Sequence, residues 1–227
     1  MDLFAELSDQ VHAAFEARNK ARDQALVQAR ALTRHAAQTI RAIHRSESGL
    51  AHEHLREARG LVDALKSDLA AFPDLFFAGY TQDAIKEYAE ASITVALIEN
   101  QPLPMPETLG IEYATYLNGL AEVTGELRRK TLDMLRQGYS PEAERLLACM
   151  DEIYALLITV DYPDAITNGL RRQTDLVRGI VERTRGDMTI SLREQRLREA
   201  MQVLATRLPD VGELPEVQPP DADDTGV

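Results

Sequence analysis

The chain contains a single cysteine, Cys149, and no long apolar run. One cysteine excludes an intrachain disulfide, and no Cys/His cluster has the spacing of a zinc site. Apolar neighbours such as Leu146 and Met150 predict that Cys149 is a core thiol rather than a nucleophile. No apolar run approaches the roughly 18 residues of a membrane span, and residues 1–6 do not resemble a signal peptide. We therefore expect a cytoplasmic protein with no membrane partner.

Alternating strands and phosphate-binding glycine loops are also missing. No alternation of apolar and polar residues is long enough for a strand, and neither GxGxxG nor GxxxxGK[ST] occurs. These absences exclude the glycine-loop nucleotide-binding classes and leave an all-α fold. The 227 residues, of which 44% are hydrophobic, are enough to bury the core of one domain.

Apolar periodicity predicts a single-domain antiparallel bundle of about seven helices over residues 1–208. Prolines between positions 102 and 106, and the Asp161-Tyr162-Pro163 segment, are the clearest breaks. The predicted helices cover about 2–45, 48–71, 85–99, 112–136, 141–159, a segment ending near 185, and 189–207. Residues 209–227 hold four prolines, six acids and no basic residue, so we expect a disordered tail there.

The distribution of charge matters more than the net charge of −12, which by itself argues against nucleic acid. From Arg18 to Arg45 there are seven basic residues and one acid. Four arginines fall within a sector of about 60° on a helical wheel, apart from the apolar stripe. This arginine ridge consists of Arg30, Arg34, Arg41 and Arg45. Guanidinium groups match phosphate oxygens and bind them without reading sequence, so the ridge predicts nucleic-acid binding. The alternative is a solvated or ion-paired face.

Two acidic pairs, Glu87 with Glu90 and Glu122 with Glu126, lie on successive predicted helices. Spacings of three and four place the side chains of each pair roughly 5–6 Å apart on one side of a helix. The predicted helix at 85–99, which carries Glu87 and Glu90, is apolar on more than one side, so these carboxylates need a partner charge or a metal. The second pair lies on a face of small residues, including Gly119 and Gly125, that a helix or a ligand could approach closely. Carboxylates without His or Cys suit Mg²⁺ or Mn²⁺, whereas the alternative is solvated acids in a Glu-rich protein.

Three separated segments resemble the translin and translin-associated factor X family. They are KEYAEA at 86–91, LGIE at 109–112 followed by YLNGLAEVTGELRR at 116–129, and the arginine ridge ending in AIHR at 42–45. The resemblance covers about residues 20–185 in the same helix order. It implies a helical protein that assembles into hollow, often octameric shells and binds single-stranded RNA or DNA.

The chain is most like the factor X branch of that family, which implies a metal-dependent endoribonuclease. The resemblance assigns catalysis and Mg²⁺ or Mn²⁺ binding to four acids, namely Glu87, Glu90, Glu122 and Glu126. Glu122 is one methylene longer than the aspartate that this branch has at its third acid. The implied partners are single-stranded RNA or DNA and further copies of the chain, most simply in a homo-octamer. Co-assembly with a paralogue is left open.

Two other functions stay open at this point. A non-catalytic translin-like shell needs only the arginine ridge, and leaves the acids as folding or solubility features. An all-α nucleoside triphosphate pyrophosphohydrolase binds Mg²⁺ through ExxE and ExxD motifs on adjacent helices. The ExxxE spacing of Glu122 and Glu126 disfavours this last class.

Overall fold

The computed structural model describes residues 3–207, which form nine helices and no strand. The all-α prediction is therefore confirmed, whereas the predicted tail at 209–227 lies outside the described residues. The six long helices are α1 (Leu3–His44), α2 (Ser48–Asp68), α4 (Gly79–Ile98), α6 (Tyr113–Leu135), α7 (Pro141–Leu157) and α9 (Leu170–Arg207). Three single-turn helices that periodicity did not predict are α3 (Pro73–Phe76), α5 (Pro106–Leu109) and α8 (Asp164–Thr167). No helix in residues 3–207 is long and apolar enough to cross a membrane.

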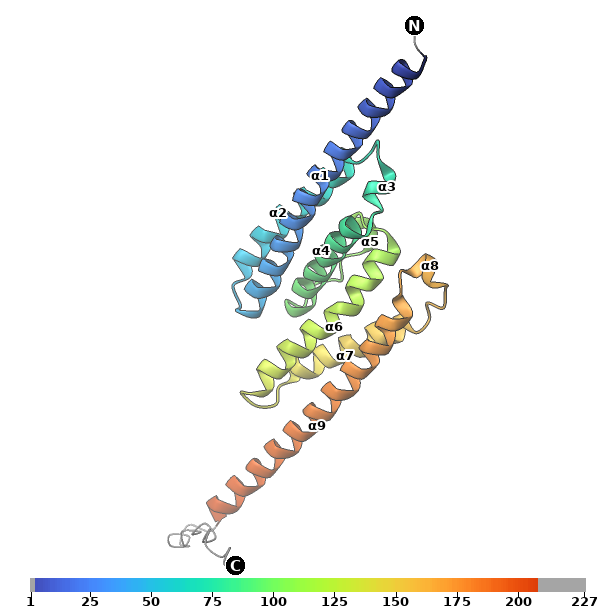
Figure 1. The fold of residues 1–227 in the computed structure, drawn as a ribbon. Coiled ribbons are helices and arrows are strands. Elements are labelled where there is room, and N and C mark those ends of the chain that lie inside the picture. Colours follow the sequence, from blue (N-terminus) through green and yellow to red (C-terminus); the bar gives the residue numbers. More distant parts are fainter. Residues whose placement is uncertain (1–2, 208–227) are drawn as a thin grey trace, which may run out of the picture.

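The long helices are arranged in successive layers (Figure 1). Helices α1 and α2 form an antiparallel pair, α4 packs on this pair, α6 packs on α4, and α7 with α9 covers the other side of α6. Helix α4 therefore lies between two layers, and its buried residues include Tyr88, Ala89 and Ile93. This position confirms the prediction that α4 is apolar on more than one side because it is buried on more than one side.

Helix α9 is continuous where the sequence predicts two helices that separate between Arg185 and Thr189. The predicted break is wrong, although Gly186 lies inside it. A glycine inside a helix costs only about 1 kcal/mol relative to alanine, and tertiary contacts on both sides of it offset this cost. Met188 is buried, and Arg128 on α6 reaches Asp187 at 2.8 Å and the hydroxyl of Thr184 at 3.0 Å. These contacts hold the helix through the glycine.

Helix α7 shows two local features. Its start has the serine N-cap and first-turn proline that are typical of helix N-termini, and the Ser140 hydroxyl accepts a hydrogen bond from the backbone N–H of Ala143 at 3.2 Å. Cys149 is half-buried against the core. Burial raises the pKa of the Cys149 thiol, which supports a structural role for this side chain.

Candidate metal centre and nucleic-acid interface

Helix α6 approaches the backbone of α4 at Gly119. A Cβ atom built on Gly119 would lie 2.9 Å from the carbonyl oxygen of Lys86 and 2.9 Å from the Cβ of Ala89. Real Cβ atoms do not come this close to their neighbours, so only glycine permits the contact. The face of small residues, where the sequence predicts close approach by a helix or a ligand, therefore meets a helix at this point. Since Glu122 follows Gly119 by about one helical turn, the contact brings Glu122 to α4.

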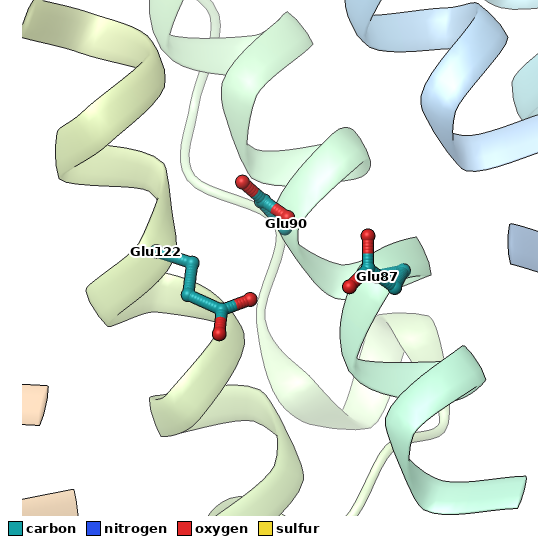
Figure 2. Close-up of side chains that lie close together, drawn as sticks. All are labelled: Glu87, Glu90 and Glu122. Carbon is teal, nitrogen blue, oxygen red and sulfur yellow. The ribbon is translucent and has the colours of Figure 1, made fainter. Parts of the chain in front are cut away.

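Three carboxylates converge between these two helices (Figure 2). Glu87 and Glu90 project from α4, and Glu122 reaches toward them from α6. Each offers one oxygen, and the three oxygens lie within 4.8 Å of one another. Ligands of Mg²⁺ stand about 2.1 Å from the ion, so opposite ligands are about 4.2 Å apart. The separation of the three oxygens is at most slightly wider than this, and the all-oxygen donor set suits a hard divalent cation. We call these three residues the acid cluster.

Glu90 is the most buried member of the acid cluster, with 9% of its surface exposed. Burial, together with the negative charges of Glu87, Glu122 and Glu126, raises the pKa of Glu90 to about 8. Burial also raises the pKa of Glu87. The acid cluster therefore contains more negative charge than its surroundings compensate, which is the condition that a bound cation relieves.

Lys86 supplies the nearest positive charge to the acid cluster. Its Nζ donates a hydrogen bond to Glu122 at 2.6 Å and lies 3.9 Å from Glu87. Burial by itself lowers the pKa of Lys86, but the hydrogen bond and the charge of Glu122 outweigh it, so the net shift is upward. The amide of Gln173 on α9 lies 3.5 Å from the same Glu122 oxygen. The roles of Lys86 and Gln173 are not evident from sequence, because both depend on where α4 and α9 meet α6.

Glu126 is not one of the three acids whose oxygens lie within 4.8 Å of one another, and it has a partner of its own. His44 Nε2, at the end of α1, lies 2.5 Å from Glu126 Oε2, and the His44 side chain is only 3% exposed. The hydrogen bond from His44, with further help from the charge of Arg129, lowers the pKa of Glu126 although burial opposes this shift. The structure thus brings together Glu87, Glu90 and Glu122, and it holds Glu126 against His44. A metal-ligating role for Glu126 stays a prediction.

Three arginines of the ridge lie along α1 and Arg45 directly follows its last residue, and all four are exposed. Within residues 3–207, Arg30, Arg34, Arg41 and Arg45 have no acidic partner within 4.0 Å. Arg30 also lines a groove of about 390 Å³ between α1 and α4, and Glu87 of the acid cluster lines the same groove. The two sites that the sequence predicts separately are therefore adjacent.

Solved structures of similar fold identify the family to which the chain belongs. The chain is similar to AfC3PO in a complex with duplex RNA, at 30% identity and a TM-score of 0.78, covering 83% of this chain and 97% of that one. A second AfC3PO structure matches at 30% identity and a TM-score of 0.74, covering 83% of this chain and 98% of that one. The chain belongs to the translin/C3PO family. The family assignment confirms the broader resemblance drawn from the three sequence segments, without deciding between its branches.

Two further relatives extend the comparison. An uncharacterized protein of Methanocaldococcus jannaschii is 34% identical over 184 residues, which are 80% of this chain and 81% of that protein. The structure of apo-NeC3PO has a TM-score of 0.74 at 18% identity and covers 84% of this chain and 98% of that one, so it supports the translin/C3PO fold alone. No protein-family profile matches the chain.

Proposed function

We propose that this protein is a metal-dependent endoribonuclease that cleaves single-stranded RNA inside a homo-oligomeric shell. The observation that carries the proposal is the acid cluster, whose three carboxylate oxygens lie within 4.8 Å of one another. The groove shared by Arg30 and Glu87 supports it, because it places a phosphate-binding side chain beside the acids. The duplex RNA bound to AfC3PO supports nucleic acid as the class of ligand.

Mg²⁺ or Mn²⁺ is the proposed cofactor, held by Glu87, Glu90 and Glu122. Carboxylate oxygens suit these hard cations, and the repulsion that raises the pKa of Glu90 is what a cation would remove. Such an ion, when bound, lowers the pKa of water and neutralises charge on a phosphate. Glu126 is proposed as an additional ligand or as a neighbouring charge that acts through its position beside the cluster.

Other side chains of the protein bind the strand and orient the acids. The arginine ridge binds phosphates of the strand and positions it along α1. Lys86, whose Nζ is 2.6 Å from Glu122, orients that carboxylate and partly neutralises the cluster. His44 orients Glu126 in the same way. Each contact restricts the rotamers of an acid, which is the preorganisation that a hydrolytic site requires.

A shell built from copies of this chain, most simply an octamer, is the proposed assembly. The N-terminal part of α1 and the C-terminal part of α9 extend beyond the other helices at opposite ends of the molecule (Figure 1). Both carry exposed apolar side chains, among them Phe15, Leu197 and Leu204. Association would bury these side chains. Light scattering at micromolar concentration should give a mass well above the 25.3 kDa of one chain, and a monomer would contradict the shell.

Labelled single-stranded RNA, incubated with the protein in Mg²⁺ or in EDTA, tests the proposed activity. We expect fragments in Mg²⁺ and intact RNA in EDTA. A stable complex that never yields fragments would instead indicate the non-catalytic shell. In that case Glu122 would have a structural role, as the partner of Lys86 in an ion pair. Hydrolysis of a nucleoside triphosphate with no RNA cleavage would indicate the pyrophosphohydrolase alternative.

A further inference from the structure

The groove between α1 and α4 differs in chemistry from both the arginine ridge and the acid cluster. Its volume is about 390 Å³, within the range of roughly 300–1,000 Å³ that is usual for small-ligand pockets. Leu26, Ala29 and Ala84 give it an apolar lining, and Arg30 and Glu87 connect it to the two predicted sites. The groove is therefore large enough for one nucleotide unit and mostly apolar where a base would lie.

Tyr80 gives the groove an unused polar group. It lies at the start of α4 and lines the groove. Its hydroxyl oxygen is buried and has no hydrogen-bond partner within residues 3–207. Buried hydroxyls are normally satisfied, because an unpaired one carries the full cost of its lost hydration. Because this oxygen has almost no exposed surface, a ligand in the groove supplies the missing partner once the Tyr80 ring turns toward it.

The charges around the groove select the part of a nucleotide that can enter it. Asp83 and Glu87 both line it, and two carboxylates repel a phosphate. A nucleobase is uncharged, has an apolar face that aromatic rings bind, and has edge groups that can pair with a hydroxyl or a carboxylate. Arg30, at the same groove, is free of acidic partners within residues 3–207 and suits the adjoining phosphate.

We propose that this groove is a base-binding subsite, in which Tyr80 contacts one unpaired nucleobase of the strand while Arg30 binds an adjacent phosphate. The subsite rests on the proposed function, because it assumes that a nucleic-acid strand follows α1. Since Glu87 belongs both to the groove and to the acid cluster, the bound base lies beside the phosphate that is cleaved. Bases in a duplex are stacked and paired, so the subsite selects single strands.

The experiment measures binding in EDTA, where no cleavage occurs, by fluorescence anisotropy of two labelled strands of ten nucleotides. One is an unstructured RNA of A and U, and the other has the same ribose-phosphate backbone without bases. We expect the parental protein to bind the base-containing strand about tenfold more tightly than the abasic strand, from base–aromatic contact. Tyr80→Phe should bind the base-containing strand about fivefold more weakly, which is the effect of one lost hydrogen bond. Its affinity for the abasic strand should be unchanged.

Arg30→Ala is the matched control, because loss of a phosphate contact should weaken the binding of both strands equally. Tyr80→Phe should keep or raise the melting temperature, since its hydroxyl has no partner in the free protein. Equal affinity of Tyr80→Phe and the parental protein for the base-containing strand, or an equal loss for both strands, overturns the subsite. If RNA binds with this pattern but is never cleaved in Mg²⁺, the nuclease proposal fails and the subsite stands. If the parental protein binds neither strand, both proposals fall.

Discussion

A Cβ atom added to Gly119 would lie 2.9 Å from the Cβ of Ala89, so α4 and α6 can meet only because position 119 has no side chain. Gly119→Ala should push the helices apart and destabilise the fold by about 1–3 kcal/mol, as overpacking does. It should also weaken Mn²⁺ binding, because Glu122 follows on the displaced helix. Urea unfolding and calorimetric titration of Mn²⁺ measure the two effects.

Gly125 provides the matched control on the same helix. A Cβ built there meets nothing within 4 Å. Gly125→Ala should therefore stabilise the protein by about 0.5–1 kcal/mol, since alanine suits a helix better than glycine, and should leave Mn²⁺ affinity unchanged. Equal stability of the two variants would show that the close approach at Gly119 does not constrain the helices.

Glu122→Gln keeps the size of the side chain and removes one charge from the acid cluster. Cleavage of RNA should fall by about 10²-fold, or about 2.7 kcal/mol of transition-state stabilisation, while binding through the arginine ridge persists. Glu126→Gln should lower the cleavage rate only about tenfold, because His44 Nε2 lies 2.5 Å from that carboxylate. Loss of a group that neighbours the metal ligands typically has an effect of this size. Single-turnover cleavage rates at saturating Mg²⁺ compare the two.

Glu152 on α7 is a suitable control for these substitutions, because it is exposed and has no hydrogen bond or ion pair within residues 3–207. Glu152→Gln should cleave at the parental rate. If Glu126→Gln is as damaging as Glu122→Gln, then all four acids act as one site, as the sequence resemblance implies. Parental rates in Glu122→Gln would exclude the acid cluster from catalysis.

The pKa of about 8 for Glu90 predicts how the metal-free protein responds to pH. Between the ordinary value of 4.5 and about 8, the native state retains a proton that the unfolded state has released. Stability should therefore fall as pH rises through this window, by at most about 1.4 kcal/mol per pH unit, and level off above it. Urea unfolding in EDTA between pH 5 and pH 9 gives the profile.

Glu90→Gln removes the titrating group while keeping a polar side chain of the same size. Its stability should depend less on pH over this window and should exceed that of the parental protein at the alkaline end. Mg²⁺ should flatten the parental profile in a similar way, because a bound cation compensates the ionised carboxylate. A parental profile that rises with pH over the same window would show that Glu90 is ionised in the native state.

Replacing Arg30, Arg34 and Arg41 together by alanine should weaken binding of all single strands to a similar degree. Binding weakens as salt rises, and the slope of log K against log salt concentration is roughly −0.7 per phosphate contact for single strands. Loss of three contacts should therefore make this slope shallower by about 2. Anisotropy titrations at several salt concentrations measure the slope. A loss of thermal stability with an unchanged slope would indicate that these arginines support packing instead.

A control for this triple variant is available on other helices. Arg56, Arg172 and Arg178 are exposed and lie outside the ridge, the groove and the acid cluster. Their replacement by alanine removes the same charge from the protein. The salt slope should then stay close to the parental value, and an equal change would show that binding responds to net charge rather than to the ridge.

The amino-acid sequence by itself determined the features that depend on neighbours along one helix. Apolar spacing determined the long helices, the prolines near 102–106 ended one of them, and the Ser140-Pro141 pair started another. It also determined that Arg30, Arg34 and Arg41 share one face of α1 and that Glu87 and Glu90 share one face of α4. These relations follow from 3.6 residues per turn, which is the same wherever the helix lies in the fold.

Only the tertiary structure decided which residues of different helices meet. Glu122 joins the acid cluster because Gly119 permits contact with α4, whereas Glu126, four residues later, meets His44 from the end of α1. Contacts between helices also keep α9 continuous through Gly186 and form the groove lined by Arg30 and Glu87. Periodicity gives the direction of each side chain around its own helix. The register and distance between helices come from side-chain packing over the whole core, which no local spacing encodes.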